Sequence, residues 1–287
     1  MWPIFRYELA RFRWQIIGWG GALFVIGLLV MPLYDVVLQQ REQLEQLMKR
    51  LPPAFAAFFG NINAIFRPEG FLSVRYFMLM PLVLGIFAIL AGSGLLAADE
   101  EKGILDLVLA HPVSRSALYL GRLAALVAAT LAILVIGWLG LVVPMRWSSL
   151  DVGWGTLVLP FLSLLAVLLV FGTLALVFSM ILPSRRQAGM MSGLLLVASY
   201  FITSFARINK DLEPLAKLSP LDYYQSGEAI MGFNGRWFAG LLTVAGLLAA
   251  LAWWRFERRD IRVSGEGVWR LPLLRRRHGG SPDPLGK

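Results

Sequence analysis

One short segment brings together several residues that could do chemistry. Positions 99–115 read DEEKGILDLVLAHPVSR. Its acids stand at a predicted helix start, where they complement the helix dipole. Apolar residues then predict a short helix that Pro112 ends, and Ser114 is suited to cap the next helix. Two interpretations stay open: an exposed helix that docks in a partner's groove, or a capped loop lying on the membrane surface.

The residue types of catalytic and metal sites are otherwise sparse. The chain has no Cys, and its two His residues, His111 and His278, have no spaced partner. Thiolate chemistry and a histidine metal site are therefore not expected. No Gly-x-x-x-x-Gly-Lys-Ser/Thr sequence occurs to cradle phosphates. Scattered serines do not form a hydrolase triad, so the chain is not expected to be an enzyme by itself.

The composition is that of a membrane protein. Of the 287 residues, 57% are hydrophobic and 16% are charged, and the mean hydropathy is +0.67. A soluble domain carries about 25% charged residues. The first apolar run is longer than a signal-peptide core and lacks a small-residue cleavage site, so we expect it to stay as a membrane anchor.

Six stretches are long and apolar enough to cross a bilayer, which takes roughly 20 residues as a helix. We therefore predict an all-α integral membrane domain over 1–254, followed by a basic tail over 255–287. The fourth apolar run, 152–184, is longer than one span needs, and a re-entrant start there stays open. The predicted spans are 14–34, 76–98, 123–145, 156–183, 187–206 and 237–254.

The distribution of charge predicts the topology. Most of the 27 Lys and Arg residues fall on one side if the two termini share that side. The positive-inside rule therefore predicts that both termini are cytoplasmic, in the cell (inner) membrane. The net charge of +9 is then explained without nucleic acid as a partner.

The N-terminal residues 1–13 have an amphipathic helical pattern. Trp2, Phe5, Leu9 and Phe12 fall on one face. We predict from this pattern a separate helix lying along the lipid surface.

Small and hydroxyl residues recur in the second and fifth predicted spans. Such residues let helices approach closely, and packing within one subunit is the default interpretation. The alternative places them at a subunit interface that lines a transport pathway. A pathway that is lined by hydroxyl groups and has no ionisable side chains suits a hydrophobic or amphipathic substrate better than an ion. The residues concerned are Gly92, Ser93, Gly94, Gly189, Ser192, Gly193 and Ser199.

The segment 101–122 resembles the first cytoplasmic loop of ABC-2 type transporter permeases. The similar residues are Glu101 to Leu105, then His111 to Arg115, then Gly121-Arg122. Ser219-Pro220-Leu221 and Phe256 to Asp260 agree as well, so the resemblance covers nearly the whole chain. One departure is Ile104, where the family usually has Thr. It removes a hydroxyl and leaves the apolar face intact.

The resemblance implies that two permeases pair, as a homodimer or with a related permease, and that each binds a separate ABC ATP-binding subunit. ATP and Mg would then be bound by that ATPase and not by this chain. It also implies short extracellular helices over 207–236, and export as the direction. The coupling segment would comprise Glu100, Glu101, Gly103, Ile104, Leu105, Leu107, Pro112, Val113, Ser114 and Arg115.

Two other functions have the same topology. A membrane assembly or interaction protein without transport would need no ATPase. An ion-coupled secondary transporter would stay active after ATP depletion and stop when the ion gradient collapses.

Overall fold

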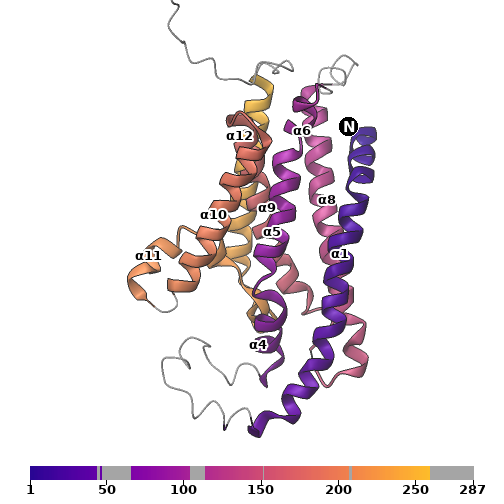
Figure 1. Cartoon of the computed structure of the whole chain (residues 1–287), viewed down its shortest axis with the longest axis vertical. Helices are drawn as coiled ribbons and strands as arrows, with labels where there is room; N and C mark the ends of the chain where they lie inside the picture. Colours follow the sequence, from indigo (N-terminus) through magenta and orange to yellow (C-terminus); the bar gives the residue numbers. More distant parts are fainter. Residues whose placement is uncertain (44–45, 47–65, 104–113, 151, 207–208, 259–287) are drawn as a thin grey trace, which may run out of the picture.

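The computed structural model describes residues 1–43, 46, 66–103, 114–150, 152–206 and 209–258. Within these residues the secondary structure is entirely helical, which confirms the predicted all-α class (Figure 1). The long helices are α1 (Trp2–Gln39), α5 (Met80–Gly94), α8 (Arg115–Val142), α9 (Val158–Ile181), α10 (Arg185–Ala206) and α12 (Gly235–Arg258). The short helices are α4 (Pro68–Leu72), the π-helical η2 (Ser73–Phe77), α6 (Ala97–Glu101), η3 (Pro144–Trp147), η4 (Lys210–Leu212), α11 (Glu213–Ala216), η5 (Pro220–Tyr223) and η6 (Ser226–Ile230).

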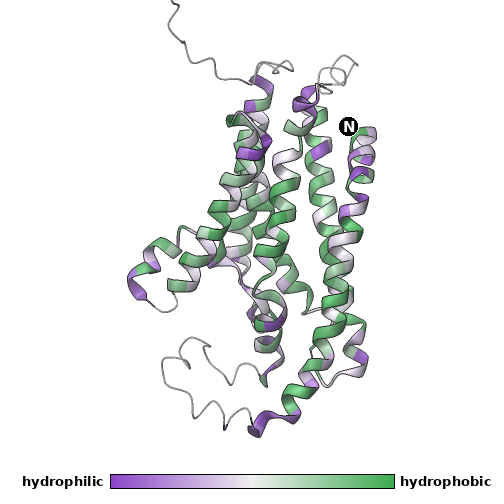
Figure 2. Ribbon diagram, in the orientation of Figure 1, coloured by the Kyte–Doolittle hydropathy of each residue, from purple (hydrophilic) through white to green (hydrophobic). Residues whose placement is uncertain are grey.

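Helix α9 forms the centre of the bundle. It is apolar on all sides, as suits a helix surrounded by other helices or by lipid, and most of its residues are buried. Helices α5, α10 and α12 pack around it, while α1 packs along α8 at one flank. Figure 2 shows the apolar residues running through the middle of the long helices and the hydrophilic ones gathered toward their ends.

Glycines allow two of these helix pairs to touch backbone to backbone. A Cβ on Gly27 would lie 2.7 Å from the Gly140 carbonyl oxygen, where α1 crosses α8. A Cβ on Gly92 would lie 2.0 Å from the Gly172 carbonyl oxygen, where α5 crosses α9. Both distances are too short for any side chain larger than hydrogen, so these crossings depend on glycine.

Among the described residues, five helices are long and apolar enough to cross a membrane, or six if one bent pair counts as a single span. The five are α1, α8 with η3, α9, α10 and α12. The second predicted span, 76–98, corresponds to the pair 68–77 and α5, which bend by 43°. The bend lies between the π-helical η2 and the restart at Met80, with Pro81 in the first turn of α5. Proline has no amide hydrogen to continue the preceding helix.

The predicted separate interfacial helix at the N-terminus is wrong, because residues 2–13 belong to the same helix as the first span. After Pro3, no proline or glycine occurs before Gly18, so nothing interrupts the hydrogen bonding. The four predicted surface residues also differ in environment. Phe12 is buried, Phe5 and Leu9 are half-buried, and Trp2 is 66% exposed.

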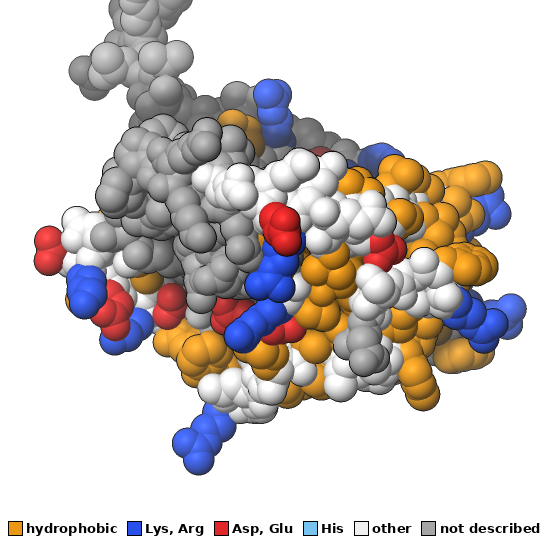
Figure 3. Space-filling view, turned by 90° about the horizontal axis from the view of Figure 1, so that it is seen from below, with side chains coloured by type: hydrophobic (Ala, Val, Ile, Leu, Met, Phe, Trp, Pro, Cys, Tyr) orange, Lys and Arg blue, Asp and Glu red, His pale blue; other side chains and the backbone are white. Residues whose placement is uncertain are grey.

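The bundle has two ends. The end called here the N-terminal end holds the start of α1, α6 and the last turns of α12 (Figure 1). The opposite end holds α4 and η3. Viewed from the opposite end, apolar side chains form broad surfaces and charged ones are scattered between them (Figure 3). The four short helices η4, α11, η5 and η6 occupy the segment for which the sequence predicted short helices.

Candidate functional site

The segment that carries the predicted coupling residues begins with α6 at the N-terminal end. Asp99 and Glu100 lie in the first turn of this helix, but it ends at Glu101 and not at Pro112 as the sequence predicted. Lys102 ends it, and Gly103 has φ = 66°, a left-handed conformation that glycine adopts without strain. This left-handed conformation therefore explains why glycine occupies position 103. The predicted coupling residues Ile104, Leu105, Leu107, Pro112 and Val113 lie outside the described residues.

Ser114 caps the helix that follows this segment. Its side chain accepts a hydrogen bond from the Ala117 amide at 3.2 Å, which confirms the predicted N-cap. The first turn of α8 also contacts the end of α12. Arg115 Nη1 donates to the Glu257 carbonyl oxygen at 3.3 Å, and the Ser116 hydroxyl donates to the Glu257 carboxylate. The two ends of the coupling segment are thus held on the bundle.

Asp99 is buried, and two arginines from other helices neutralise it. Arg122 Nη2 on α8 lies 2.5 Å from Asp99 Oδ2, and Arg122 Nη1 donates to the Leu95 carbonyl oxygen at 2.7 Å. Arg11 Nη1 on α1 lies 3.2 Å from both oxygens of the same carboxylate. Burial of an ion is costly unless it is paired and hydrogen-bonded. Asp99 therefore ties α6 to α1 and α8.

Glu8 completes this ion-pair cluster, defined here as Glu8, Arg11, Asp99 and Arg122. Its carboxylate lies 3.5 Å from Arg11 Nη1 and 3.9 Å from Arg122 Nε. Glu8, Asp99 and Arg122 are each at most 5% exposed. Glu8 Oε2 and Arg122 Nε face each other without a hydrogen bond. The two acids balance the two bases, and one ion pair of the cluster is longer than optimal.

A further contact joins α6 to α10. Glu101 Oε1 accepts the backbone amide of Arg185 at 2.7 Å, at the start of α10. The Arg185 guanidinium covers Gly94 and donates to the Leu90 carbonyl oxygen at 3.4 Å. The base of the coupling segment therefore contacts α1, α8, α10 and, through α8, α12. Any displacement of α6 would reach most of the bundle.

Sequence reasoning missed Glu8, Arg11 and Asp99 as members of a buried site. A signal was present, because Glu8 is spaced three residues from Phe5 and four from Phe12, which puts it on their helical face. An acidic residue on an apolar helix face predicts that a basic residue is buried beside it. That partner, Arg122, is more than a hundred residues away, and only the packing of α1 on α8 identifies it.

The predicted interface residues on α5 pack within this chain. Gly92 contacts Gly172 of α9, Ser93 is 1% exposed and Gly94 lies under the Arg185 side chain. These positions make close contacts between helices of one chain.

The predicted interface residues on α10 differ from one another. Gly189 faces α5, since a Cβ there would lie 3.6 Å from Ser93 Oγ, and Ser192 is fully buried. A Cβ on Gly193 would meet no atom within 4 Å. Ser199 is half-buried, and its carbonyl oxygen accepts the Thr203 hydroxyl. Gly193 is thus the position of this group with open space in front of it.

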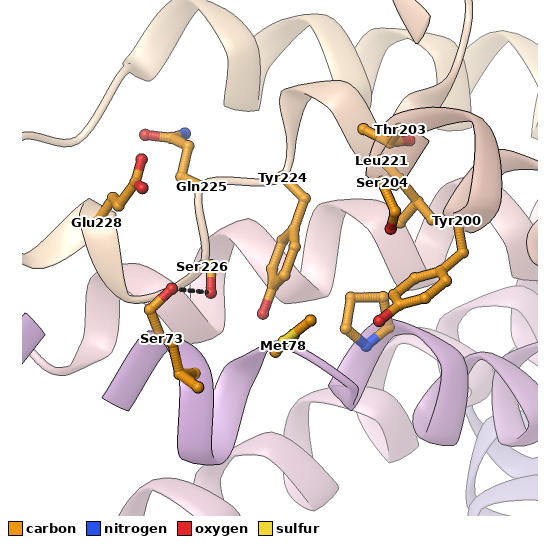
Figure 4. A pocket seen from close by; sticks show the side chains of 12 residues that line it. Ser73, Met78, Tyr200, Thr203, Ser204, Leu221, Tyr224, Gln225, Ser226 and Glu228 are labelled. Atoms are coloured by element: carbon orange, nitrogen blue, oxygen red, sulfur yellow. Dashed lines mark hydrogen bonds between the residues drawn. The ribbon is translucent and has the colours of Figure 1, made fainter. Parts of the chain in front are cut away.

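A cavity of about 120 Å³ lies nearer the opposite end, between η2, α10 and the segment 221–228. Figure 4 shows hydroxyl-bearing side chains from these elements converging on it, among them Ser73, Tyr200, Tyr224 and Ser226. Met78, Pro81 and Leu221 supply apolar wall, and Glu228 is the one charged side chain among the described lining residues. The wall of this cavity therefore combines hydroxyl groups with apolar side chains.

Two irregular backbone features form one wall of this cavity. Residues 73–77 form a π-helix, and Ser226 has φ = 48°, a conformation that non-glycine residues rarely adopt. The two are joined, because the Ser73 and Ser226 hydroxyls are hydrogen-bonded at 2.9 Å (Figure 4). Gly227 packs so closely that a Cβ would lie 2.4 Å from the Glu69 carbonyl oxygen. Both features are typical of functional sites.

A family model described as ABC-2 family transporter protein matches residues 2–261. The chain belongs to the ABC-2 transporter family. The match covers every described helix, so this ABC-2 protein is a multi-pass membrane protein and a transport permease subunit. A comparison with individual curated proteins gives no match.

Within the described residues of this ABC-2 protein, no group of three or more His, Asp or Glu side chains could hold a metal ion. The acidic residues that are buried are instead neutralised by arginine. The described part of the protein therefore has two candidate functional features. One is the set of buried ion pairs that join the helices, and the other is the lined cavity.

Proposed function

We propose that this chain is the membrane-spanning subunit of an ATP-driven exporter, coupled to a separate cytoplasmic ATPase that binds ATP and Mg. Two copies, or this chain and a related permease, form the complete transmembrane part. The chain by itself does not hydrolyse ATP. The observation that carries the proposal is the ion-pair cluster, which joins the base of the coupling segment to α1 and α8.

The mechanism follows from these contacts. An ATPase that binds residues 104–113 moves α6, because α6 directly precedes them. Asp99 then displaces Arg122 and Arg11, and Glu101 displaces the start of α10. Buried ion pairs hold the helices firmly while intact, because separating the partners leaves an uncompensated charge. The cluster therefore transmits movement from the coupling segment into the spans.

The substrate class follows from the cavity near the opposite end. Its mixture of hydroxyls and apolar wall suits a hydrophobic or amphipathic molecule. We propose that the N-terminal end faces the cytoplasm, because the positive-inside rule favours that side for the sequence segments with most of the Lys and Arg residues. In this arrangement the cavity is nearer the outer face, in keeping with export from the cytoplasm across the cell membrane.

The test is the association with the ATPase. We expect an ATP-binding subunit to co-purify with the native chain, and the double substitution Ile104→Asp and Leu107→Asp to abolish this association while membrane insertion is kept. The matched control is Leu215→Asp with Met231→Asp, two exposed apolar residues remote from the coupling segment. That control should retain the ATPase.

Unchanged co-purification of the coupling variant would contradict the proposed docking segment. Transport that survives ATP depletion and stops when an ion gradient collapses would instead indicate a secondary transporter. An intact complex that moves no solute would indicate a membrane assembly protein.

A further inference from the structure

A groove separate from the candidate pathway lies beside the start of α12. It has a volume of about 460 Å³ and is bounded by residues 217–223 and by the first turns of α12. Its floor is apolar, formed by Gly240, Leu241 and Val244 along α12. Tyr223 and Trp237 form a wall, with their rings in an edge-to-face contact at 5.9 Å.

The charged residues that line this groove are both basic. They are Lys217 and Arg236, whereas the neighbouring acids Glu213 and Asp222 are not among the lining residues. Lys217 Nζ lies 2.9 Å from Glu213 Oε1, and this hydrogen bond lowers the pKa of the Glu213 carboxyl. An ammonium group has three donors, so the ion pair with Glu213 leaves others for a ligand.

Arg236 is the second cation, and it lies in the first turn of α12. Within the described part of the chain, no carboxylate lies within ion-pair distance of its guanidinium. A guanidinium binds phosphate oxygens with a planar pair of donors. The groove thus has a positive mouth and an apolar floor.

The position of the groove in the bilayer follows from the length of α12. Its 24 residues give a helix of about 36 Å, slightly longer than the roughly 30 Å of hydrocarbon it crosses. The first turn, with Arg236 and Trp237, therefore lies at the level of the lipid headgroups. Tryptophan is enriched at this level in membrane proteins. The floor residues are farther along α12 and lie among the acyl chains.

We propose that this groove binds an anionic phospholipid of the bilayer. The lipid phosphate contacts Arg236 and Lys217, and one acyl chain lies along Gly240, Leu241 and Val244. A soluble anion would use the positive mouth alone and leave the apolar floor uncovered. A zwitterionic lipid would bring a cationic group to the same two cations. Only an anionic lipid complements both parts of the groove.

Glycine at position 240 supplies the space for the acyl chain. A Cβ there would meet no atom within 4 Å, so a larger side chain would fill the groove without disturbing the helix packing. Gly246, on the same helix, is equally open but does not line the groove. The two positions form a matched pair for substitution.

The first experiment measures lipid retention by native mass spectrometry of the full chain. The protein is released from nanodiscs that contain phosphatidylglycerol or phosphatidylcholine. We expect phosphatidylglycerol to be retained at least tenfold more strongly than phosphatidylcholine. Arg236→Gln combined with Lys217→Gln should remove this preference. Lys210→Gln, which neutralises an exposed cation outside the groove, should keep it.

The second experiment tests the acyl-chain contact with the matched glycines. Gly240→Phe should lower retention of phosphatidylglycerol at least tenfold, and Gly246→Phe should leave it unchanged. Equal retention of the two lipids by the native chain would overturn the proposal. So would equal losses in the two glycine variants, or complete displacement of the lipid by inorganic phosphate, which would indicate a site for soluble anions.

Discussion

At the scale of single residues, Arg122 holds the N-terminal end of the bundle together. Its guanidinium donates to a carbonyl oxygen of the chain preceding α6 and to the Asp99 carboxylate, and its Nε faces Glu8 without a hydrogen bond. A buried guanidinium without its acids would be strongly unfavourable, and so would the acids without it. The four members of the ion-pair cluster therefore depend on one another.

Arg122→Gln is expected to destabilise the chain by about 3–5 kcal/mol, because it leaves two buried carboxylates with only Arg11 to neutralise them. The measurement is the midpoint of thermal unfolding of the purified protein in detergent. The double variant with Asp99→Asn should lose less stability, since it removes both members of the closest pair. Arg186→Gln, at an exposed position, is the control. Equal midpoints for Arg122→Gln and the control would show that the cluster does not stabilise the fold.

At the scale of elements, the second predicted span packs into the bundle at the crossing of α5 and α9. Gly92 and Gly172 touch there, and the bent segment before α5 places η2 against η6 and the cavity. Helices without a hydrophobic driving force between them rely on such close approach for their packing energy. Gly92 on α5 and Gly193 on α10 thus have different roles, which their shared residue type does not reveal.

Substitution of these glycines should separate the two roles. Gly92→Ala places a Cβ where the Gly172 carbonyl lies, and overpacking of this kind costs about 1–3 kcal/mol. Gly193→Ala meets no atom and gains helix propensity, so its stability should equal or exceed that of the native chain. Thermal unfolding in detergent compares the two. A similar loss for both would contradict the intrachain crossing.

At the scale of the whole molecule, the flank formed by α10 is poorly covered. In the 18-residue apolar stretch of α10 only 17% is buried, whereas in that of α9 78% is buried. Large apolar side chains of α10 are exposed on this flank. In one chain this surface faces lipid, and in the proposed dimer it faces a second copy. The exposed residues on α10 are Met190, Met191, Leu194, Leu195, Val197, Phe201 and Phe205.

A cysteine at Gly193 is expected to cross-link two copies in the membrane, because this position opens outward on the α10 flank. The chain has no native Cys, so the new thiol is the one available for oxidation. Gly189→Cys faces Ser93 of its own chain and should cross-link less. Gly246→Cys on α12 is the lipid-facing control. Dimer bands on a denaturing gel after oxidation provide the measurement. If Gly193→Cys gives no more dimer than the control, the α10 flank is a lipid surface.

Composition and periodicity were enough to predict the all-α membrane class, because spanning a bilayer requires long apolar helices whatever their partners. The family was predicted separately, from the resemblance of residues 101–122 to ABC-2 permeases. Local chemistry was enough for the Ser114 cap, since the cap depends on neighbours within four residues. The same local reasoning failed at residues 2–13. An amphipathic pattern describes a surface helix and the end of a buried helix equally well.

Only the tertiary structure decided which distant residues meet. Glu8, Asp99 and Arg122 form one buried cluster, and Ser73 meets Ser226 at the cavity, across long separations in the chain. The sequence records the charge and size of each side chain, but the free energy of a buried charge depends on the neighbours that helix packing brings to it. For that reason the membrane class could be predicted from the sequence, and the connections between its helices could not.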